Sequence, residues 1–252
     1  MIEISSKTND HFRRWADLAS ARGIKKHQEF ILMGEKLIHE FLENPSFRVK
    51  GEIVHEDLKS VTMTAPSLKG QRIPVFKLPK ALFNEVDVVG THFNLLVLEP
   101  KEITPLKEGG KPEGLEVISP LGDPSNLGAL ARSALAFGAS KMILTEESCS
   151  PYHPKAIKAS AGALLKLPLY KIGKFTDFVA ANEQIYVLDM KGENVAGFKW
   201  PKNLRLAIGE EGPGFSGLKG LQRISVTTQS VESLNATVAA SIALYSYSCS
   251  QH

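Results

Sequence analysis

The sequence is poor in cysteine and lacks long apolar segments. Cys149 and Cys249 are its only cysteines, and their spacing matches no metal-binding motif. No apolar run is long enough to span a bilayer, and the first residues do not join a cationic start to an apolar stretch. These absences disfavour a disulfide framework, membrane insertion and secretion. We therefore expect a cytoplasmic protein with no membrane partner.

The sequence also lacks the glycine-rich turn with which many α/β proteins bind a dinucleotide. Its net charge of +3 and pI near 8.7 permit a polyanionic partner without requiring one. The basic residues are unevenly distributed, because Lys7 to Lys26 contains six of them and only two acids. Such a run is often a solvated helix face, and contact with nucleic acid is the alternative interpretation.

The composition and the positions of proline and glycine predict two globular domains. Apolar residues make up 43% and charged residues 23% of the 252 positions, which is typical of a folded soluble chain. Short strand-like and helical segments alternate over residues 1–100. The stretch from Glu99 to Gly114 holds three prolines and three glycines. We place an N-terminal domain at 1–100, a linker at 101–114 and a larger domain at 115–252.

Strands and helices alternate regularly in the larger domain. We predict strands at 116–120, 141–144, 167–171, 184–190, 204–208 and 223–227. The predicted helices are 127–137, 154–164, 175–181 and 234–247. Continuous apolar strands separated by helices indicate an α/β fold with a mostly parallel sheet and helices on both faces.

Polar residues gather where three of these strands end. Asp123, Asn126 and Arg132 follow the first strand, a glycine loop with Glu210 and Glu211 follows the fifth, and a polar segment ending at Asn235 follows the sixth. In open α/β sheets, ligands bind outside the carboxyl ends of the strands. The sequence therefore predicts a ligand site at this edge of the sheet.

The residues themselves leave the ligand open. Asp123 and Asn126 are placed to cap the following helix, so Asn126 is either a cap or a site residue. Arg132 is either a surface residue or the partner of a phosphate, because an arginine near a helix start opposes the helix dipole. The two acids of the glycine loop would repel a pyrophosphate. A cationic or neutral ligand, such as S-adenosylmethionine, is compatible with that loop.

Three segments in order resemble the signature motifs of the SpoU-type 2′-O-ribose RNA methyltransferases of the SPOUT superfamily. They are DPSNLGALARSA (Asp123 to Ala134), LAIGEEGPGFS (Leu206 to Ser216) and SVESLNATVAASIALY (Ser230 to Tyr245). The segment from Ser150 to Leu164 is similar to that family's second helix. Residues 1–100 are similar, more loosely, to the ribosomal-protein-like substrate-binding domain of many members. The resemblance favours RNA contact by the basic run.

The resemblance implies a trefoil knot, S-adenosylmethionine as cofactor, no metal, and a homodimer whose sites are completed across the interface. Carried over by motif position, the catalytic set is Asn126, Arg132, Glu211, Ser233 and Asn235. The cofactor-binding set, acting mostly through main-chain groups, is Leu188, Gly209, Ile224, Ser225, Val226 and Leu234. Many members have an Ile-Pro pair where this chain has Ser225-Val226, which leaves the adenine contact open.

The resemblance implies an RNA 2′-O-methyltransferase that acts on ribosomal RNA. A transfer RNA substrate and a non-catalytic RNA-binding protein that retains the fold are the alternatives, and an ordinary nucleotide-dependent α/β enzyme is a distant one. A ribose hydroxyl is a poor nucleophile. Since arginine stays protonated, we expect Arg132 to hold the RNA phosphate and stabilise developing alkoxide charge, with the proton acceptor left open.

Overall fold

The computed structural model describes residues 1–107, 109–180, 184–209, 215, 218, 221–231 and 233–251. The chain folds into two compact units. Unit 1 comprises 1–102 and 150–165, and unit 2 comprises 103–149 and 166–252. The packing boundary at residue 102 lies within the predicted linker. Compact units reflect packing and not function, so the division into a substrate-binding and a catalytic domain stays a prediction.

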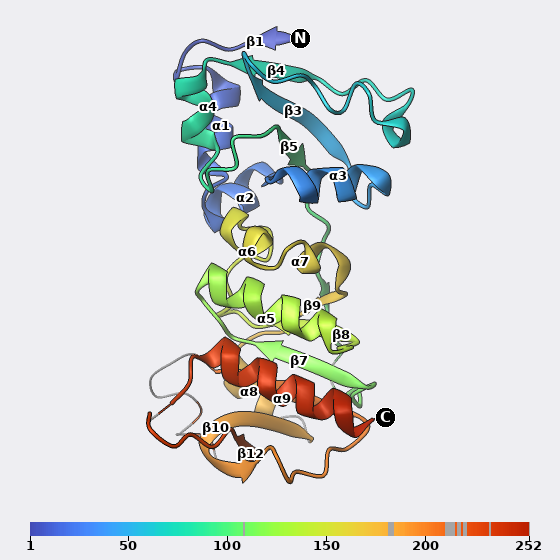
Figure 1. The fold of residues 1–252 in the computed structure, drawn as a ribbon, viewed down its shortest axis with the longest axis vertical. Coiled ribbons are helices and arrows are strands. Elements are labelled where there is room, and N and C mark those ends of the chain that lie inside the picture. Colours follow the sequence, from blue (N-terminus) through green and yellow to red (C-terminus); the bar gives the residue numbers. More distant parts are fainter. Residues whose placement is uncertain are drawn as a thin grey trace. The chain divides into compact units, whose positions relative to one another are not determined.

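Unit 1 is built around a five-stranded mixed sheet (Figure 1). The strand order is β1-β4-β3-β5-β2, with β1, β4 and β3 parallel and β5 and β2 antiparallel to their neighbours. Its elements are β1 (Ile2–Glu3), α1 (Asp10–Asp17), α2 (Ala21–His27), β2 (Phe30–Leu32), α3 (Glu35–Glu43), β3 (Val49–His55), η1 (Pro66–Leu68), β4 (Val75–Leu78), α4 (Lys80–Val86), β5 (Leu95–Leu98) and α6 (Pro154–Ala159).

The helical periodicity from Asp10 to Ala21 is divided between two helices. Trp15 is buried from α1, and its ring packs on Phe76 of β4 with centroids 4.9 Å apart. Ser20 ends the break between the helices, because its hydroxyl accepts a hydrogen bond from the Gly23 amide as the N-cap of α2. Apolar spacing therefore located the buried face, while a single capping serine set the break.

Unit 2 is built around a seven-stranded sheet with the order β12-β10-β11-β7-β8-β9-β6, and every strand pair is parallel. This confirms the predicted α/β class. Its elements are β6 (Thr104–Pro105), β7 (Leu115–Ser119), α5 (Pro124–Ala136), β8 (Lys141–Leu144), β9 (Leu169–Lys171), α8 (Phe175–Ala180), β10 (Ile185–Asn194), β11 (Leu204–Ala207), β12 (Gln222–Ser225) and α9 (Ala236–Ser250). Between β8 and β9, α7 (Ala163–Lys166) spans the boundary of the two units.

The two faces of this sheet carry different helices. Phe175 and Phe178 of α8 join a buried cluster with Ile118 of β7 and Val187 of β10. Strand residues alternate between faces, so Val117 points the other way. On that other face α5 and α9 lie side by side (Figure 1). The parallel sheet is therefore covered on both faces, as its apolar strands require.

A buried ion cluster ties the predicted linker to the sheet. Glu116 of β7 accepts from the Arg205 guanidinium at 2.9 Å and from the Lys141 ammonium at 3.0 Å. Arg205 also donates to the carbonyl of Gly110 at 2.6 Å. Because β6 lies within the same connection and pairs with β9, residues 101–114 are partly built into unit 2. The proline and glycine content indicated only an exposed connection.

The predicted helix 154–164 is interrupted. Ala161 and Gly162 have φ angles of 46° and 82°, which lie in the left-handed region that ends helices. A β-carbon on Gly162 would lie 2.5 Å from Leu37 of α3, so glycine is needed there for conformation and for space. Tyr152, just before α6, packs on Phe30 of β2 with ring centroids 4.8 Å apart. These contacts join residues 150–165 to unit 1.

Candidate functional site

The sheet of unit 2 changes winding direction between β7 and β11. After β7 the chain passes through α5 to β8 on one side, whereas after β11 it leads to β12 at the opposite edge. Phe215, which follows β11, lies in the cluster on the α8 face, while α5 packs with α9 on the other face. The two connections thus diverge outside the carboxyl ends of adjacent parallel strands. In open α/β sheets such a divergence marks the crevice in which ligands bind, so we place the candidate site here.

Four strand ends meet at this crevice. Pairing aligns Ile118 of β7 with Ala207 of β11, and Ala207 with Val187 of β10. Leu188 of β10 pairs in turn with Ile224 of β12. Leu188, Ile224 and Gly209, which lies two residues after the end of β11, were all predicted cofactor contacts from separate parts of the sequence. The register places their segments on three neighbouring strands.

The motif after β7 forms the start of α5. Asp123 is its N-cap, and its carboxylate accepts from the Asn126 amide at 2.8 Å. The expectation that Asn126 is also a cap is wrong, because Asn126 lies inside the first turn and its side chain is half-exposed. Its amide group is therefore available for another partner.

Arg132 lies past the middle of α5, which begins at Pro124. The argument that its charge opposes the helix dipole is wrong for this reason, since that effect is confined to the first and last turns. Arg132 is exposed, and in the described part of the chain it makes no hydrogen bond or ion pair. An exposed guanidinium without an acid partner can bind a phosphate in a bidentate way.

Helices α5 and α9 run parallel in a fixed register. The hydroxyls of Ser133 and Ser241 are 2.7 Å apart, and four residues further along each helix the rings of Phe137 and Tyr245 have centroids 5.7 Å apart. Extending this register backwards brings Asn126 level with residues 233–235. The helix rise puts Arg132 about 9 Å further along. The first and third sequence motifs are therefore brought together at one end of the helix pair.

The third motif supplies the N-cap of α9. The side-chain oxygen Oδ1 of Asn235 accepts from the Thr237 amide at 3.0 Å and from the Thr237 hydroxyl at 2.6 Å. Asn235 and Ser233 are exposed, whereas Leu234 is half-buried between them. The structure thus gives Asn235 a folding role that the sequence motif did not reveal.

The glycine loop is described in part. Glu211 and residues 210–214 lie outside the described residues, so the predicted role of Glu211 stays a prediction. A β-carbon on Gly209 would lie 3.0 Å from the ring of Phe215. That ring is itself buried against Phe175, with centroids 4.8 Å apart. Gly209 is thus needed where the backbone crosses an aromatic ring.

Three residues that sequence reasoning missed shape this crevice. Gly192 lies so close to β12 that a β-carbon would be 2.4 Å from backbone atoms of Arg223 and Ile224. Arg223 pairs with Asp189 and donates at 2.8 Å to the carbonyls of Phe215 and Leu218. Charged residues at strand ends are usually solvated, so only the folded structure distinguishes these two. No sequence signal marked them.

Ser225 and Val226 are the pair at which the sequence departs from the pattern that it resembles. Ser225 is buried, and its hydroxyl donates to the carbonyl of Gly192 at 2.9 Å. Its own carbonyl accepts from the Val195 amide at 2.9 Å. The departure from the family pattern therefore serves to fasten β12 to the chain that passes over it at Gly192.

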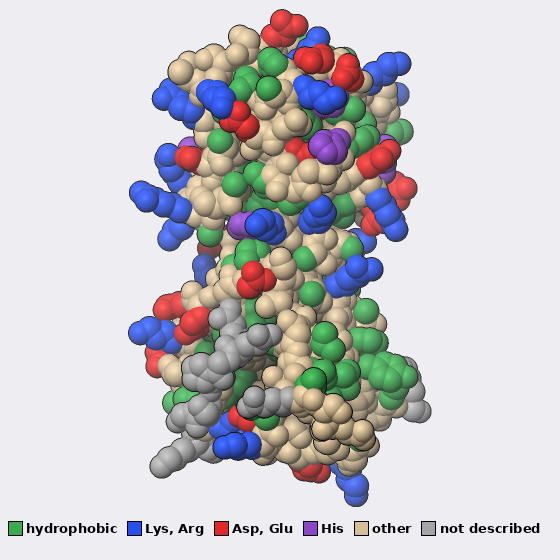
Figure 2. All heavy atoms as spheres, turned by 60° about the vertical axis from the view of Figure 1, so that its left-hand side comes forward, with side chains coloured by type: hydrophobic (Ala, Val, Ile, Leu, Met, Phe, Trp, Pro, Cys, Tyr) green, Lys and Arg blue, Asp and Glu red, His purple; other side chains and the backbone are tan. Residues whose placement is uncertain are grey.

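The basic run of unit 1 is largely neutralised. Lys7 pairs with Glu85 at 2.5 Å, Arg13 with Asp10 at 2.7 Å, Arg14 with Glu29 at 3.1 Å, and Lys26 with Asp17 at 3.2 Å. Hydrogen bonds from His27 and Lys26 lower the pKa of Asp17, which keeps it ionised. Arg22 and Lys25 are exposed and form no ion pair with any described residue. Figure 2 shows Lys and Arg side chains interspersed with acids over unit 1.

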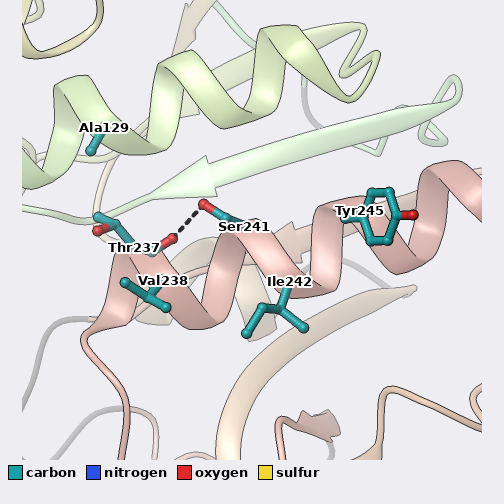
Figure 3. A pocket seen from close by; sticks show the side chains of 6 residues that line it. All are labelled: Ala129, Thr237, Val238, Ser241, Ile242 and Tyr245. Carbon is teal, nitrogen blue, oxygen red and sulfur yellow. Dashed lines mark hydrogen bonds between the residues drawn. The ribbon is translucent and has the colours of Figure 1, made fainter.

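An apolar groove runs along the outer surface of α5 and α9. It is lined by Ala129 of α5 and by Thr237, Val238, Ser241, Ile242 and Tyr245 of α9 (Figure 3). Val238, Ile242 and Tyr245 are 48%, 38% and 58% exposed. A hydrogen bond with Cys249 raises the pKa of Tyr245 above its ordinary value. A phenol is already neutral near pH 7 at that ordinary value. Hydrophobic side chains gather at the surface of unit 2 (Figure 2).

None of the helices in the described part of the chain is both long and apolar enough to cross a bilayer. The described residues also contain no group of three or more metal-ligating side chains.

Residues 117–245 match the model of the SpoU rRNA Methylase family. A Syntrophobacter fumaroxidans protein named ribosomal RNA small subunit methyltransferase G 2 is 35% identical over 250 residues, which cover 98% of this chain and 49% of the relative. The chain thus spans about half the length of that relative, whose name does not say which half acts on RNA. A Bacillus subtilis protein named 23S rRNA (guanosine(2553)-2′-O)-methyltransferase RlmP is 25% identical, covering 97% of this chain and 98% of the relative.

A solved structure has the same fold over nearly the whole chain. The AdoMet-bound rRNA methyltransferase from Sinorhizobium meliloti superposes with a TM-score of 0.78 at 20% identity, covering 97% of this chain and 96% of that one. At this identity the likeness establishes the fold alone. It extends through both compact units, including residues 1–100.

Proposed function

This chain belongs to the SpoU rRNA methylase family, and on that premise we propose that it methylates a ribose 2′-hydroxyl of RNA with S-adenosylmethionine as methyl donor. The observation that carries the proposal is the convergence of three family motifs at the winding switch of one parallel sheet. Each motif is a short segment, but together they occupy the two connections and the helix end that bound a single crevice.

The residues at the strand ends fit such a cofactor. Ile224 and Ser225 are buried, and Leu188, Val226 and Leu234 are half-buried. Their small or apolar side chains leave main-chain groups and apolar contact as the means of holding a ligand. This chemistry suits an adenosine derivative without phosphates. When bound, S-adenosylmethionine supplies an electrophilic methyl group whose bond to sulfur breaks as the 2′-oxygen attacks.

We assign the polar residues around that methyl group as follows. Arg132 holds the RNA phosphate and stabilises negative charge on the ribose oxygen as its proton departs. Asn126 orients the ribose or Arg132, and Ser233 and Asn235 border the transfer pocket from the start of α9. Glu211 completes the set by its place in the second motif. The final proton acceptor is left open.

Ribosomal RNA is the proposed substrate class, and the reaction takes place in the cytoplasm. The S. fumaroxidans and B. subtilis relatives are both named for action on ribosomal RNA. The exposed Arg22 and Lys25 of α2 are proposed to contact RNA phosphates within unit 1. A transfer RNA substrate is the alternative, and both RNA classes belong in the test.

We further propose a homodimer that buries the groove of α5 and α9. A neutral apolar surface with three large exposed side chains is costly to leave in water. Arg132 lies three residues after Ala129 of this groove, on a neighbouring part of the α5 surface. A second copy seated there would border Arg132. The trefoil knot of the family stays a prediction for this chain.

The reaction is tested by incubating the purified protein with methyl-labelled S-adenosylmethionine and unmethylated ribosomal or transfer RNA. We expect label in ribosomal RNA, recovered after digestion as a 2′-O-methylated nucleoside. Label on a base would contradict the assigned acceptor. Cofactor binding by calorimetry without label transfer to either RNA would instead favour a non-catalytic RNA-binding protein.

A further inference from the structure

Arg223 touches all three segments from which the proposed cofactor site is built. It directly precedes Ile224 on β12, and its guanidinium Nη1 donates to the carboxylate of Asp189, which directly follows Leu188 on β10. Its Nη2 donates to the main-chain oxygens of Phe215 and Leu218, both at 2.8 Å. One side chain therefore connects β10, β12 and the segment after β11.

The partners of Arg223 are fixed from other directions. The Phe215 ring is buried in the cluster on the α8 face and lies under Gly209. The Phe215 carbonyl also accepts from the Leu218 amide at 3.0 Å. A guanidinium can bond two carbonyls and a carboxylate in one plane, whereas a lysine ammonium lacks that planar geometry. The site thus requires arginine and not just positive charge.

The ion pair also controls the charge of the crevice. The side chains of Arg223 and Asp189 are 22% and 16% exposed, so their charges are only partly screened by water. Asp189 neutralises the guanidinium beside Leu188 and Ile224. An unpaired cation there would repel the positive sulfonium of the proposed methyl donor. Asp189 therefore orients Arg223 and keeps the site compatible with a cationic ligand.

We propose that Arg223, held by Asp189, is a positioning residue that fixes Phe215 and Leu218, which follow β11, against β10 and β12 so that this side of the cofactor site is formed before S-adenosylmethionine binds. This inference rests on the proposed function. Fixing the segment in advance removes an ordering cost from cofactor binding. It acts on cofactor affinity and not on the methyl-transfer step, because Arg223 belongs to none of the assigned catalytic positions.

The test compares S-adenosylmethionine affinity by calorimetry in the full-length protein and in Arg223→Gln, Arg223→Lys and Asp189→Asn. We expect Arg223→Gln to raise Kd by roughly 10- to 100-fold, the range for losing hydrogen bonds to a charged group. The Kd of Arg223→Lys for S-adenosylmethionine should lie between that of Arg223→Gln and that of the unchanged protein. In steady-state kinetics the KM for S-adenosylmethionine should rise while kcat at saturating cofactor stays within about twofold.

Glu116→Gln is the matched control. It weakens a buried ion pair of the same sheet, near the opposite ends of the strands and away from the crevice. We expect this variant to lower thermal stability while leaving the Kd for S-adenosylmethionine unchanged. Exchange of the Leu218 amide with solvent should accelerate in Arg223→Gln and not in Glu116→Gln. This local readout separates positioning from general destabilisation.

Failure of the positioning role can be distinguished from failure of the proposed function. If the unchanged protein does not bind S-adenosylmethionine, the proposed function itself fails. If it binds and folded Arg223→Gln binds equally well, the positioning role is wrong. Should Arg223→Gln not fold, Arg223→Lys decides in its place, because unchanged affinity in that folded variant would equally overturn the requirement for a guanidinium.

Discussion

At the residue scale, the account depends on which side chains are committed to folding and which are available for chemistry. Asp123 and Asn235 cap helices, whereas Arg132 is exposed and forms no bond with any described residue. The sequence predicted the capping role of Asp123, whereas the motif match selected Asn235 and Arg132 without separating a capping from a catalytic role. Hydrogen-bond partners separate the two roles, because a capping side chain and a catalytic side chain occupy similar places in a sequence.

Arg132→Ala tests the central catalytic assignment. Because Arg132 is exposed and makes no contact that the fold needs, we expect near-normal thermal stability and cofactor affinity. Methyl transfer should fall by about 100-fold or more, as for loss of an electrostatic stabiliser. Parallel calorimetry and labelled-methyl incorporation measure the two effects. Transfer at the rate of the unchanged protein would refute the assignment.

Gly192→Ala tests the close crossing of the chain over β12. The added β-carbon would lie 2.4 Å from backbone atoms of Arg223 and Ile224, so the strand must move. We expect a loss of about 1–3 kcal/mol in the free energy of unfolding, measured by chemical denaturation. Gly197→Ala is the control, because a β-carbon there meets no atom within 4 Å. Equal free energies of unfolding for Gly192→Ala and Gly197→Ala would contradict the close approach of Gly192 to β12.

At the element scale, the α/β class and the strand positions of unit 2 could be predicted from the sequence. The predicted strand at 141–144 coincides with β8, and the other five predicted strands overlap observed ones, since continuous apolar runs suit a sheet buried on both faces. The breaks at Ser20 and at Ala161-Gly162 were not predicted. Each depends on a local hydrogen bond or a backbone angle, which hydrophobic periodicity does not report.

The pairing of the basic residues in α1 and α2 could not be predicted from the sequence, for a physical reason. The sequence counts six basic residues between Lys7 and Lys26, yet four of them have acid partners, and Glu85 and Glu29 lie outside that stretch. Net charge along a chain does not reveal which cations the fold neutralises. RNA contact by the basic run stays a prediction, and Arg22 and Lys25 are its two cations that form no ion pair with a described residue.

Replacing Arg22 and Lys25 together with alanine should weaken RNA binding without changing cofactor affinity. If each contacts one phosphate, the slope of log K against log salt should fall by about two. The Arg13→Ala, Lys26→Ala double variant removes the same charge from residues already paired with acids, so we expect a smaller change. Filter binding across a salt series measures both. An equal decrease in the salt slope for both double variants would argue against specific RNA contact by Arg22 and Lys25 of α2.

Ile242→Glu should disrupt the proposed dimer. The charge would be buried in the groove of α5 and α9 on association, at a cost that an apolar interface cannot offset. Light scattering should change from twice the 27.5 kDa chain mass to the single chain mass. Met63→Glu, at an exposed apolar position of unit 1, is the control and should leave the mass unchanged. An active monomer of the unchanged protein would refute the dimer.

At the scale of the whole molecule, each compact unit carries a different part of the proposed function. Unit 2 contains the winding switch, the motif residues and the Arg223-Asp189 pair, while unit 1 carries Arg22 and Lys25. The fold of both units matches a solved rRNA methyltransferase over 97% of this chain. The sequence predicted the site from motifs, and the structure shows that α5 and α9, which carry motif segments about 100 residues apart, contact each other.

The most direct test of the central claim is a map of 2′-O-methylation in total RNA from cells with and without the gene, read nucleotide by nucleotide. We predict that one or a few ribosomal RNA riboses lose the methyl group in the deletion strain. Reintroducing the unchanged gene should restore it, and the Arg132→Ala gene should not. An identical methylation map in both strains would contradict the account.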